Sequence, residues 1–213
     1  MKIGQLARYH LFRNQHVIQF SPIRTGSTVI YNLLRCSLPS KNITKTHTYS
    51  RHFSHLPVVA TIRHPLDSIA SMLQVLSHEP NEKNIRSTVA CFKDNGGYDL
   101  IQVKNEGNLL LLRYENFVNN YETVFTSFET FFGITISGPQ RAELTEKYNL
   151  EKAREHAASQ GEWSKWDPVT QIHGHHISKF AGRPNYYKEY FTAQQIDLLK
   201  NLLGDYLREF HYA

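Results

Sequence analysis

The stretch FSPIRTGSTVIYNLL (Phe20–Leu34) joins the end of an apolar segment to a run whose apolar residues recur at helical spacing. Between them lies a short turn that is rich in hydroxyl groups and contains one arginine and one glycine. This order predicts a strand, a tight loop and a helix, and the free backbone N–H groups at the start of such a helix favour anions. We therefore interpret residues 21–28 as a phosphate-binding loop.

The loop differs from that of ATP- and GTP-binding proteins. Their pattern, G-x-x-x-x-G-K-[ST], has a lysine after the last glycine, whereas Ser27 follows Gly26 here. The cation instead precedes the glycine, at Arg24, and hydroxyl donors stand at Thr25, Ser27 and Thr28. When the loop is considered alone, an ordinary helix capped by Ser27 or Thr28 explains it as well as a phosphate site does.

The rest of the chain alternates between strand-like and helix-like segments. Strands are expected at 16–20, 42–47, 58–62 and 108–117, and helices at 26–38, 65–76, 81–95, 119–134, within 137–159 and from 192 onward. This alternation predicts an α/β fold with three layers, in which helices flank a mainly parallel central sheet in a P-loop-like arrangement. We expect one domain spanning residues 1–213, with a long functional loop over 160–190.

A second cationic turn follows the expected strand at 58–62. The sequence VVATIRHPLDSIAS places Arg63 at the strand end, Pro65 in the first helical turn and Ser71 about two turns further on. Ligands of parallel α/β sheets bind beyond the carboxyl ends of the strands, so Arg63 and Ser71 can grip one phosphate from two sides. Taken alone, the turn is better explained by a surface arginine paired with Asp67.

Together, the two turns resemble the signatures of the cytosolic and Golgi sulfotransferase superfamily, whose members use 3′-phosphoadenosine-5′-phosphosulfate (PAPS). The segment Pro22–Thr28 resembles the first signature, which grips the 5′-phosphosulfate, although it has one extra residue after the proline. The segment Arg63–Ser71 resembles the second signature, which holds the 3′-phosphate, although His64 replaces an acidic or amide residue. The resemblance implies that PAPS is the sulfuryl donor, that no metal is required, and that cofactor-binding residues include Arg24, Thr25, Gly26, Ser27, Thr28, Arg63 and Ser71.

Two later segments extend the resemblance over residues 16–200. LLLRYENF (residues 110–117) is similar to a family strand whose tyrosine lies near the adenine, which implies that role for Tyr114. SKFAGRPNYYKEYFTAQQ (residues 178–195) is similar to the segment that closes over the cofactor, with Lys179 and Gly182 as the implied binding residues. The family tryptophan there corresponds to Tyr186 or Tyr187.

The catalytic residues are also implied by the resemblance. Sulfuryl transfer needs a base for the proton of the acceptor and a cation for the charge that develops on the leaving oxygen. KTH (Lys45–His47) resembles the family's K-[ST]-H, which implies His47 as the base and Lys45 as a residue that orients the transferred group. Arg24 would stabilise the leaving phosphate oxygen.

Other groups can be weighed against His47, since the chain has twelve histidines. The nearby candidates are His52, His55 and His64, and a carboxylate base would come from Glu79 or Glu82. The sequence HGHH (His173, His175 and His176) suggests zinc, but too few ligands lie close in sequence to close a tetrahedral site. We therefore expect this segment to border the pocket, with Trp163 and Trp166 as an apolar or sugar-stacking wall.

Composition and charge limit the kinds of ligand and the location that are expected for this chain. The formal charge of +5 and the pI near 9.1 fit an anionic ligand without choosing one. The two cysteines are expected to be buried free thiols, and the chain lacks a secretory signal or a long apolar run, which predicts a cytoplasmic protein without stable membrane insertion. The acceptor is expected to be a small molecule, lipid or carbohydrate rather than nucleic acid, and the oligomeric state stays open.

Two other functions fit parts of the pattern. A nucleotide or nucleoside kinase on a P-loop scaffold would share the strand–loop–helix, but the missing Gly-Lys pair argues against it. A non-catalytic nucleotide-binding module would keep both cationic turns without turnover.

Overall fold

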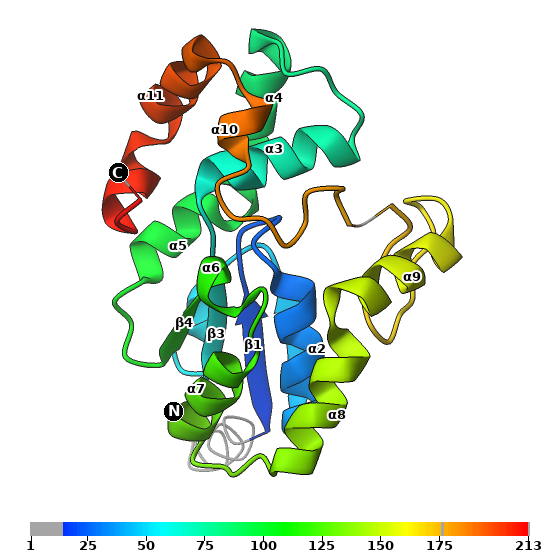
Figure 1. The fold of residues 1–213 in the computed structure, drawn as a ribbon. Helices are drawn as coiled ribbons and strands as arrows, with labels where there is room; N and C mark the ends of the chain where they lie inside the picture. The colour runs from blue at the N-terminus through cyan, green and yellow to red at the C-terminus, as the bar shows by residue number, and fades with distance from the viewer. Residues whose placement is uncertain (1–14, 176, 213) are drawn as a thin grey trace.

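The computed structural model describes residues 15–175 and 177–212. Its centre is a parallel sheet of four strands in the order β2-β1-β3-β4, which are β1 (His16–Phe20), β2 (Asn42–Thr46), β3 (Val58–Ile62) and β4 (Leu109–Arg113). Phe20 pairs with Thr46 at the end of one strand pair, and Ile62 pairs with Arg113 at the end of another. The carboxyl ends of the strands therefore meet at one edge of the sheet, as the three-layer α/β prediction requires (Figure 1).

Helices connect and cover the strands (Figure 1). They are α2 (Ser27–Ser37), α3 (Pro65–Val75), α4 (Glu82–Phe92), α5 (Tyr98–Val103), α6 (Tyr114–Phe117), α7 (Glu122–Phe132), α8 (Gly138–Tyr148), α9 (Leu150–Gln160), α10 (Tyr187–Tyr190) and α11 (Ala193–Glu209), with a 3₁₀ turn at η1 (Arg51–Phe53) and a distorted turn at η2 (Lys93–Gly97). In the part of the chain described here, no helix is both long and apolar enough to cross a bilayer.

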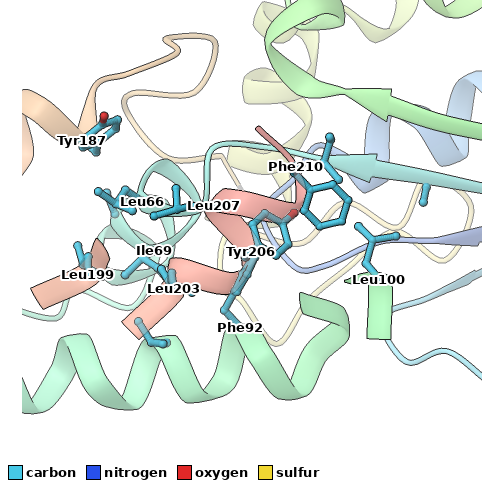
Figure 2. Close-up of a cluster of buried hydrophobic side chains, with 14 of the residues drawn as sticks. Leu66, Ile69, Phe92, Leu100, Tyr187, Leu199, Leu203, Tyr206, Leu207 and Phe210 are labelled. Atoms are coloured by element: carbon cyan, nitrogen blue, oxygen red, sulfur yellow. The ribbon is translucent and has the colours of Figure 1, made fainter. Parts of the chain in front are cut away.

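Two apolar cores hold the layers together because side chains alternate between the two faces of the sheet. On one face, Val17 and Val59 pack with apolar residues of α2, α7 and α8. On the other, Ile18 and Ala60 pack with residues of α3, α4, α5 and α11. Figure 2 shows part of this second core, where Phe92 of α4 meets Tyr206 of α11 edge to face with ring centroids 5.3 Å apart.

Two expected boundaries were wrong. The strand expected over 108–117 ends at Arg113, because Tyr114–Phe117 turns into a short helix at the edge of the sheet. The helix expected to stop at Gly96-Gly97 kinks there and resumes as α5. Gly96 has a φ of 95°, and a side chain on it would come within 2.9 Å of the His47 carbonyl oxygen, so the kink also packs η2 against the end of β2.

The segment between α9 and α10 was expected to be a long loop, and it passes over the carboxyl ends of the strands (Figure 1). One isolated antiparallel bridge joins Trp166 to His173 within it. The helix that follows begins at the expected cap, because Thr192 accepts from the backbone N–H of Gln195 while the side chain of Gln195 accepts from the N–H of Thr192.

A buried carboxylate fixes the end of this loop. Asp67 in the first turn of α3 is fully buried, and it accepts from the backbone N–H groups of Asn185 at 2.8 Å and Tyr187 at 3.0 Å. The hydroxyl of Tyr186 donates to the backbone oxygen of Asp67 at 3.1 Å. The pairing with Arg63 that was considered for this aspartate exists, at 4.0 Å, but Arg63 is buried rather than on the surface.

We predict that Asp67→Ala lowers the free energy of unfolding by about 3 kcal/mol, because it leaves two backbone N–H groups without their acceptor and the buried Arg63 without the carboxylate that lies 4.0 Å away. Asp67→Asn keeps one acceptor oxygen and should cost clearly less. Urea unfolding followed by circular dichroism measures both. Asp205→Ala is the matched control, since its ion pair with Arg208 is exposed and should change stability by less than about 0.5 kcal/mol; equal losses in all three variants would contradict the anchoring role.

Candidate active site

A cavity of about 440 Å³ opens at the carboxyl edge of the sheet. The chain moves outward from β1 to β2 and then returns to the other side of β1 as β3, so the strand order reverses between β1 and β3. Ligands of open α/β sheets bind at such a reversal. Both cationic turns predicted from the sequence line this cavity, with Arg24 and Gly26 from the first and Arg63 and Ser71 from the second.

The first turn depends on Gly26. Its φ is 87°, and a side chain there would come within 2.9 Å of the rings of both Tyr114 and Phe117. No side chain among the described residues caps α2 at this position, so the cap expected from Ser27 or Thr28 does not form. The backbone N–H groups at the start of α2 therefore face the cavity edge as an anion cradle.

Thr25 was predicted to bind the cofactor, but its hydroxyl is hydrogen-bonded inside the protein. Its hydroxyl donates to the Pro22 carbonyl at 2.7 Å and lies 2.7 Å from the hydroxyl of Thr61 in β3, and the residue is fully buried. Thr25 does not line the cavity, whereas Ser27 and Thr28 do. The Thr25 side chain thus braces the loop against the sheet.

Two cations flank the loop. Lys45 at the end of β2 donates to the Thr28 hydroxyl at 2.9 Å. Arg24 turns the other way, and its Nε and Nη2 donate to the Ser71 hydroxyl at 3.1 and 3.0 Å. Burial, with the neighbouring Arg63, lowers the pKa of Arg24 to about 10, and burial with Arg24 lowers that of Lys45 to about 8. Hydrogen bonds from Arg24 to Ser71 thus join the first signature to the second. Lys45 is the cation beside Thr28.

Arg63 at the end of β3 is only 3% exposed. Its guanidinium lies over the Tyr114 ring, with the carbon 4.2 Å from the ring centroid, and Nη1 donates to the Arg24 carbonyl at 3.4 Å. Within residues 15–175 and 177–212, Nε and Nη2 of Arg63 have no hydrogen-bond partner. A buried guanidinium with free N–H groups at a cavity wall is costly without an anion and well suited to bind one.

His47 also lines the cavity. Its Nδ1 lies 2.7 Å from the Ser21 carbonyl oxygen, which can only accept, so Nδ1 carries the proton and Nε2 of the neutral ring has a free lone pair. Burial is the main cause that lowers the pKa of His47, helped by Lys45 and Arg24, while the hydrogen bond to Ser21 opposes it. The imidazole is therefore neutral at pH 7 and can accept a proton.

The competing bases lie elsewhere. His52, His55, Glu79 and Glu82 are exposed and do not line the cavity. His64 is buried against Tyr187, with ring centroids 4.4 Å apart, and burial together with nearby cations lowers its pKa to about 4. Its Nδ1 accepts from the Leu66 N–H at 3.3 Å, so this histidine caps α3 in the manner of an aspartate or asparagine.

The two residues implied in the closing segment lie apart from the cavity. Tyr114 lines the cavity, and its hydroxyl accepts from the backbone N–H of Gly182 at 3.1 Å, but Gly182 itself does not line it. Lys179 is exposed, with its ammonium 5.2 Å from the centroid of the Phe180 ring. Ser178 was not predicted; it is buried, lines the cavity, and accepts from the Ser71 hydroxyl at 3.4 Å.

Of the two tryptophans expected to form a wall of the pocket, Trp163 lines the cavity and Trp166 does not. The His173 ring is stacked with Trp163 and with Trp166, at centroid distances of 5.0 and 5.7 Å, and both tryptophans are nearly half exposed. Trp163 and His173 line the cavity, which agrees with the expected bordering role. The described residues contain no group of three side chains arranged to hold a metal, and His176 of the HGHH run lies outside them.

The lining residues of the cavity form two groups, which we name the α4 side and the α8 side. The α4 side is lined by Ile23, His47, Met72, Cys91 and Asn95, and the α8 side by Asn32, Phe117, Tyr121, Tyr148 and Leu150. On the α4 side, the Ile23 N–H donates to the Asn95 carbonyl at 3.3 Å and the Asn95 side chain donates to the Cys91 carbonyl at 2.8 Å. On the α8 side, the Tyr121 hydroxyl donates to the Tyr148 carbonyl at 2.7 Å.

Comparison with known proteins supports the fold. No protein-family model matches the sequence, and no curated protein is significantly similar to it. Among solved structures, mouse sulfotransferase SULT7A1 complexed with PAP matches with a TM-score of 0.65 and 16% identity, over 92% of this chain and 85% of that one. Retinol dehydratase in complex with androsterone and the inactive cofactor PAP matches with a TM-score of 0.65 and 14% identity, over 92% of this chain and 81% of that one. The chain therefore has the sulfotransferase fold.

We predict that His47 titrates below pH 6.5, because burial and two cations disfavour its charged form. Proton–carbon NMR of the ring, assigned with His47→Gln, measures the pKa. Lys45→Gln removes one of the cations and should raise the pKa of His47, whereas the exposed Lys152→Gln, which pairs with Glu155 on α9, should leave it unchanged. An unshifted pKa in the Lys45→Gln variant would contradict the electrostatic coupling.

Proposed function

We propose that this chain is a PAPS-dependent sulfotransferase that acts on a hydroxyl or amine acceptor. The observation that carries the proposal is one cavity lined by two cationic turns: the start of α2 with Lys45, and the buried Arg63, two of whose nitrogens have no hydrogen-bond partner among the described residues. A nucleotide with substituents at both the 5′ and 3′ positions matches two such turns better than a triphosphate, whose phosphates are contiguous. The two structural neighbours, both complexes with PAP, support this choice.

PAPS supplies an activated sulfuryl group when it is bound. In the proposed in-line transfer, Nε2 of His47 takes the acceptor proton as the bond from the acceptor to sulfur forms. Lys45 and Arg24 offset the negative charge that stays on the 5′-phosphate oxygen when its bond to sulfur breaks. Arg24 acts only as a charge, because a guanidinium with a pKa near 10 keeps its proton at pH 7.

The α4 side is proposed as the acceptor site, because it contains His47. Apart from Asn95, its other lining residues are apolar (Ile23, Met72 and Cys91), so a small-molecule or lipid acceptor can fit there; the half-exposed Trp163 at the rim offers a stacking surface to a carbohydrate. No metal and no nucleic acid has a role in the proposed reaction, and a cytoplasmic location remains part of the proposal.

We predict that calorimetry detects adenosine 3′,5′-bisphosphate binding in EDTA, and that Arg63→Ala weakens it by about 30-fold through the loss of charge-assisted hydrogen bonds. Adenosine 5′-monophosphate lacks the 3′-phosphate, so the same variant should hardly change its affinity. Arg86→Ala, on the exposed face of α4, is the control. Tighter, Mg²⁺-dependent binding of ATP would instead favour the kinase-like alternative.

We also predict that His47→Ala lowers kcat by at least about 100-fold, since the acceptor loses its base, while the affinity for adenosine 3′,5′-bisphosphate stays within a few-fold. Formation of this nucleotide from PAPS, followed over a panel of phenols, alcohols, sugars and amines, gives kcat. The exposed His55→Ala serves as the matched variant and should turn over normally. Normal turnover by His47→Ala would remove the base assignment, and absence of turnover in the unaltered chain despite nucleotide binding would favour a non-catalytic module.

A further inference from the structure

Asn32, in the second turn of α2, is a polar residue in an otherwise apolar part of the helix. It is 1% exposed and lines the α8 side of the cavity, next to the buried Ile30, Leu33 and Leu34 of its own helix. A polar side chain at such a position is expected to have all its hydrogen bonds made. Among the described residues, Asn32 makes the two hydrogen bonds of its amide nitrogen and none with its amide oxygen.

The orientation of the Asn32 amide is fixed by chemistry. Nδ2 donates to the Thr28 carbonyl at 2.9 Å and to the Thr170 carbonyl at 2.8 Å. Carbonyl oxygens only accept, so the nitrogen must face them and the amide cannot be flipped. Oδ1 is the remaining group, and it has no partner among the described residues. This oxygen is a buried acceptor that requires an N–H or O–H donor.

The position of Asn32 indicates which part of a ligand would supply that donor. His47 belongs to the α4 side of the cavity, which the proposed function gives to the acceptor. The α8 side is therefore available to the nucleoside, and the rings of Phe117, Tyr121 and Tyr148 offer flat apolar contacts to a base there. On an adenine, the exocyclic 6-amino group is a hydrogen-bond donor on the edge of the ring.

We propose that Asn32 is the residue that selects adenine in this cavity, with Oδ1 accepting a hydrogen bond from the 6-amino group. The proposal rests on the proposed function, because it needs a nucleotide in the cavity. Its chemistry predicts a specific preference: a base with a carbonyl at position 6 would place oxygen against oxygen, and a base with only hydrogen there would leave Oδ1 unpaired. The loss of a hydrogen bond at a buried polar site gives strong discrimination of this kind.

The amide also connects base recognition to the loop over the site. Through Nδ2, Asn32 holds the carbonyl of Thr170, whose hydroxyl donates to Asp167 at 2.7 Å. The same loop contributes Trp163, Ile172 and His173 to the cavity wall. Asn32 is thus a fixed point between α2 and this loop, which keeps Oδ1 in place without a ligand.

The test compares three 3′,5′-bisphosphates by calorimetry: those of adenosine, inosine and purine riboside, which carry an amine, a carbonyl and a hydrogen at position 6. The unaltered chain should bind the adenosine compound about tenfold or more tightly than either of the others. In Asn32→Leu, which removes Oδ1, the three affinities should converge to within about twofold. Because the ratio between ligands is measured, a general weakening from the lost bonds to Thr28 and Thr170 cancels.

Controls separate the possible failures. Asn32→Ala is a second variant if Asn32→Leu does not fold, and Gln74→Leu replaces an amide on α3 that does not line the cavity and should keep the tenfold ratio. Equal binding of the three compounds by the unaltered chain, or a ratio that survives in both Asn32 variants, would overturn the role of Asn32 while leaving the proposed function intact. No binding of any of the three compounds would overturn the proposed function itself.

Discussion

The site depends on one buried cation that is only partly satisfied. Arg63 lies at the end of β3 in contact with the faces of Tyr114 and Tyr186 and 4.0 Å from Asp67. Burying a guanidinium carries a large desolvation penalty, and one carboxylate at this distance offsets only part of it. The same carboxylate is held by the N–H groups of Asn185 and Tyr187. Asp67 therefore has two roles: it stabilises the buried Arg63, and it anchors the loop over the cavity through Asn185 and Tyr187.

A similar arrangement ties the C-terminal residues to this edge of the sheet. One oxygen of Glu115 accepts from the His64 N–H at 2.7 Å, and the other accepts from the Tyr212 hydroxyl at 2.9 Å. Arg113 donates to the Phe210 carbonyl at 2.6 Å and lies over the Tyr212 ring. Residues at and just beyond the end of β4 thus bind segments that lie more than ninety positions later in the chain. The carboxyl edge of the sheet therefore binds the C-terminal residues in addition to forming the cavity.

The sequence was sufficient for the features that depend on order and spacing. Strand-like runs alternating with helices predicted the parallel sheet, and the ends of the runs placed Arg24 and Arg63 at one edge; His47 was predicted from the resemblance of KTH to a family signature, and it lines the same cavity. Features set by tertiary packing were not predictable: the hydroxyl of Thr25 is taken by Thr61 from another strand, and the strand before Tyr114 ends early because a helix forms there. The unpaired oxygen of Asn32 depends on Thr170, which is 138 residues away, and no local pattern indicates it.

The same positive field that attracts an anion also acts on His47, the proposed base. Without an anion, Lys45 and Arg24 help to lower the pKa of His47, Arg24 also lowers the pKa of Lys45, and Arg63 lowers that of Arg24. An anion held beside Lys45 and Arg24 would cancel much of this field, because an opposite charge at a few ångströms favours the protonated imidazole. The pKa of His47 would then rise, while burial, the main cause of its lowering, would still hold it below its ordinary value. In the proposed reaction, a filled donor site therefore makes His47 a stronger base and couples proton removal to the presence of the anion.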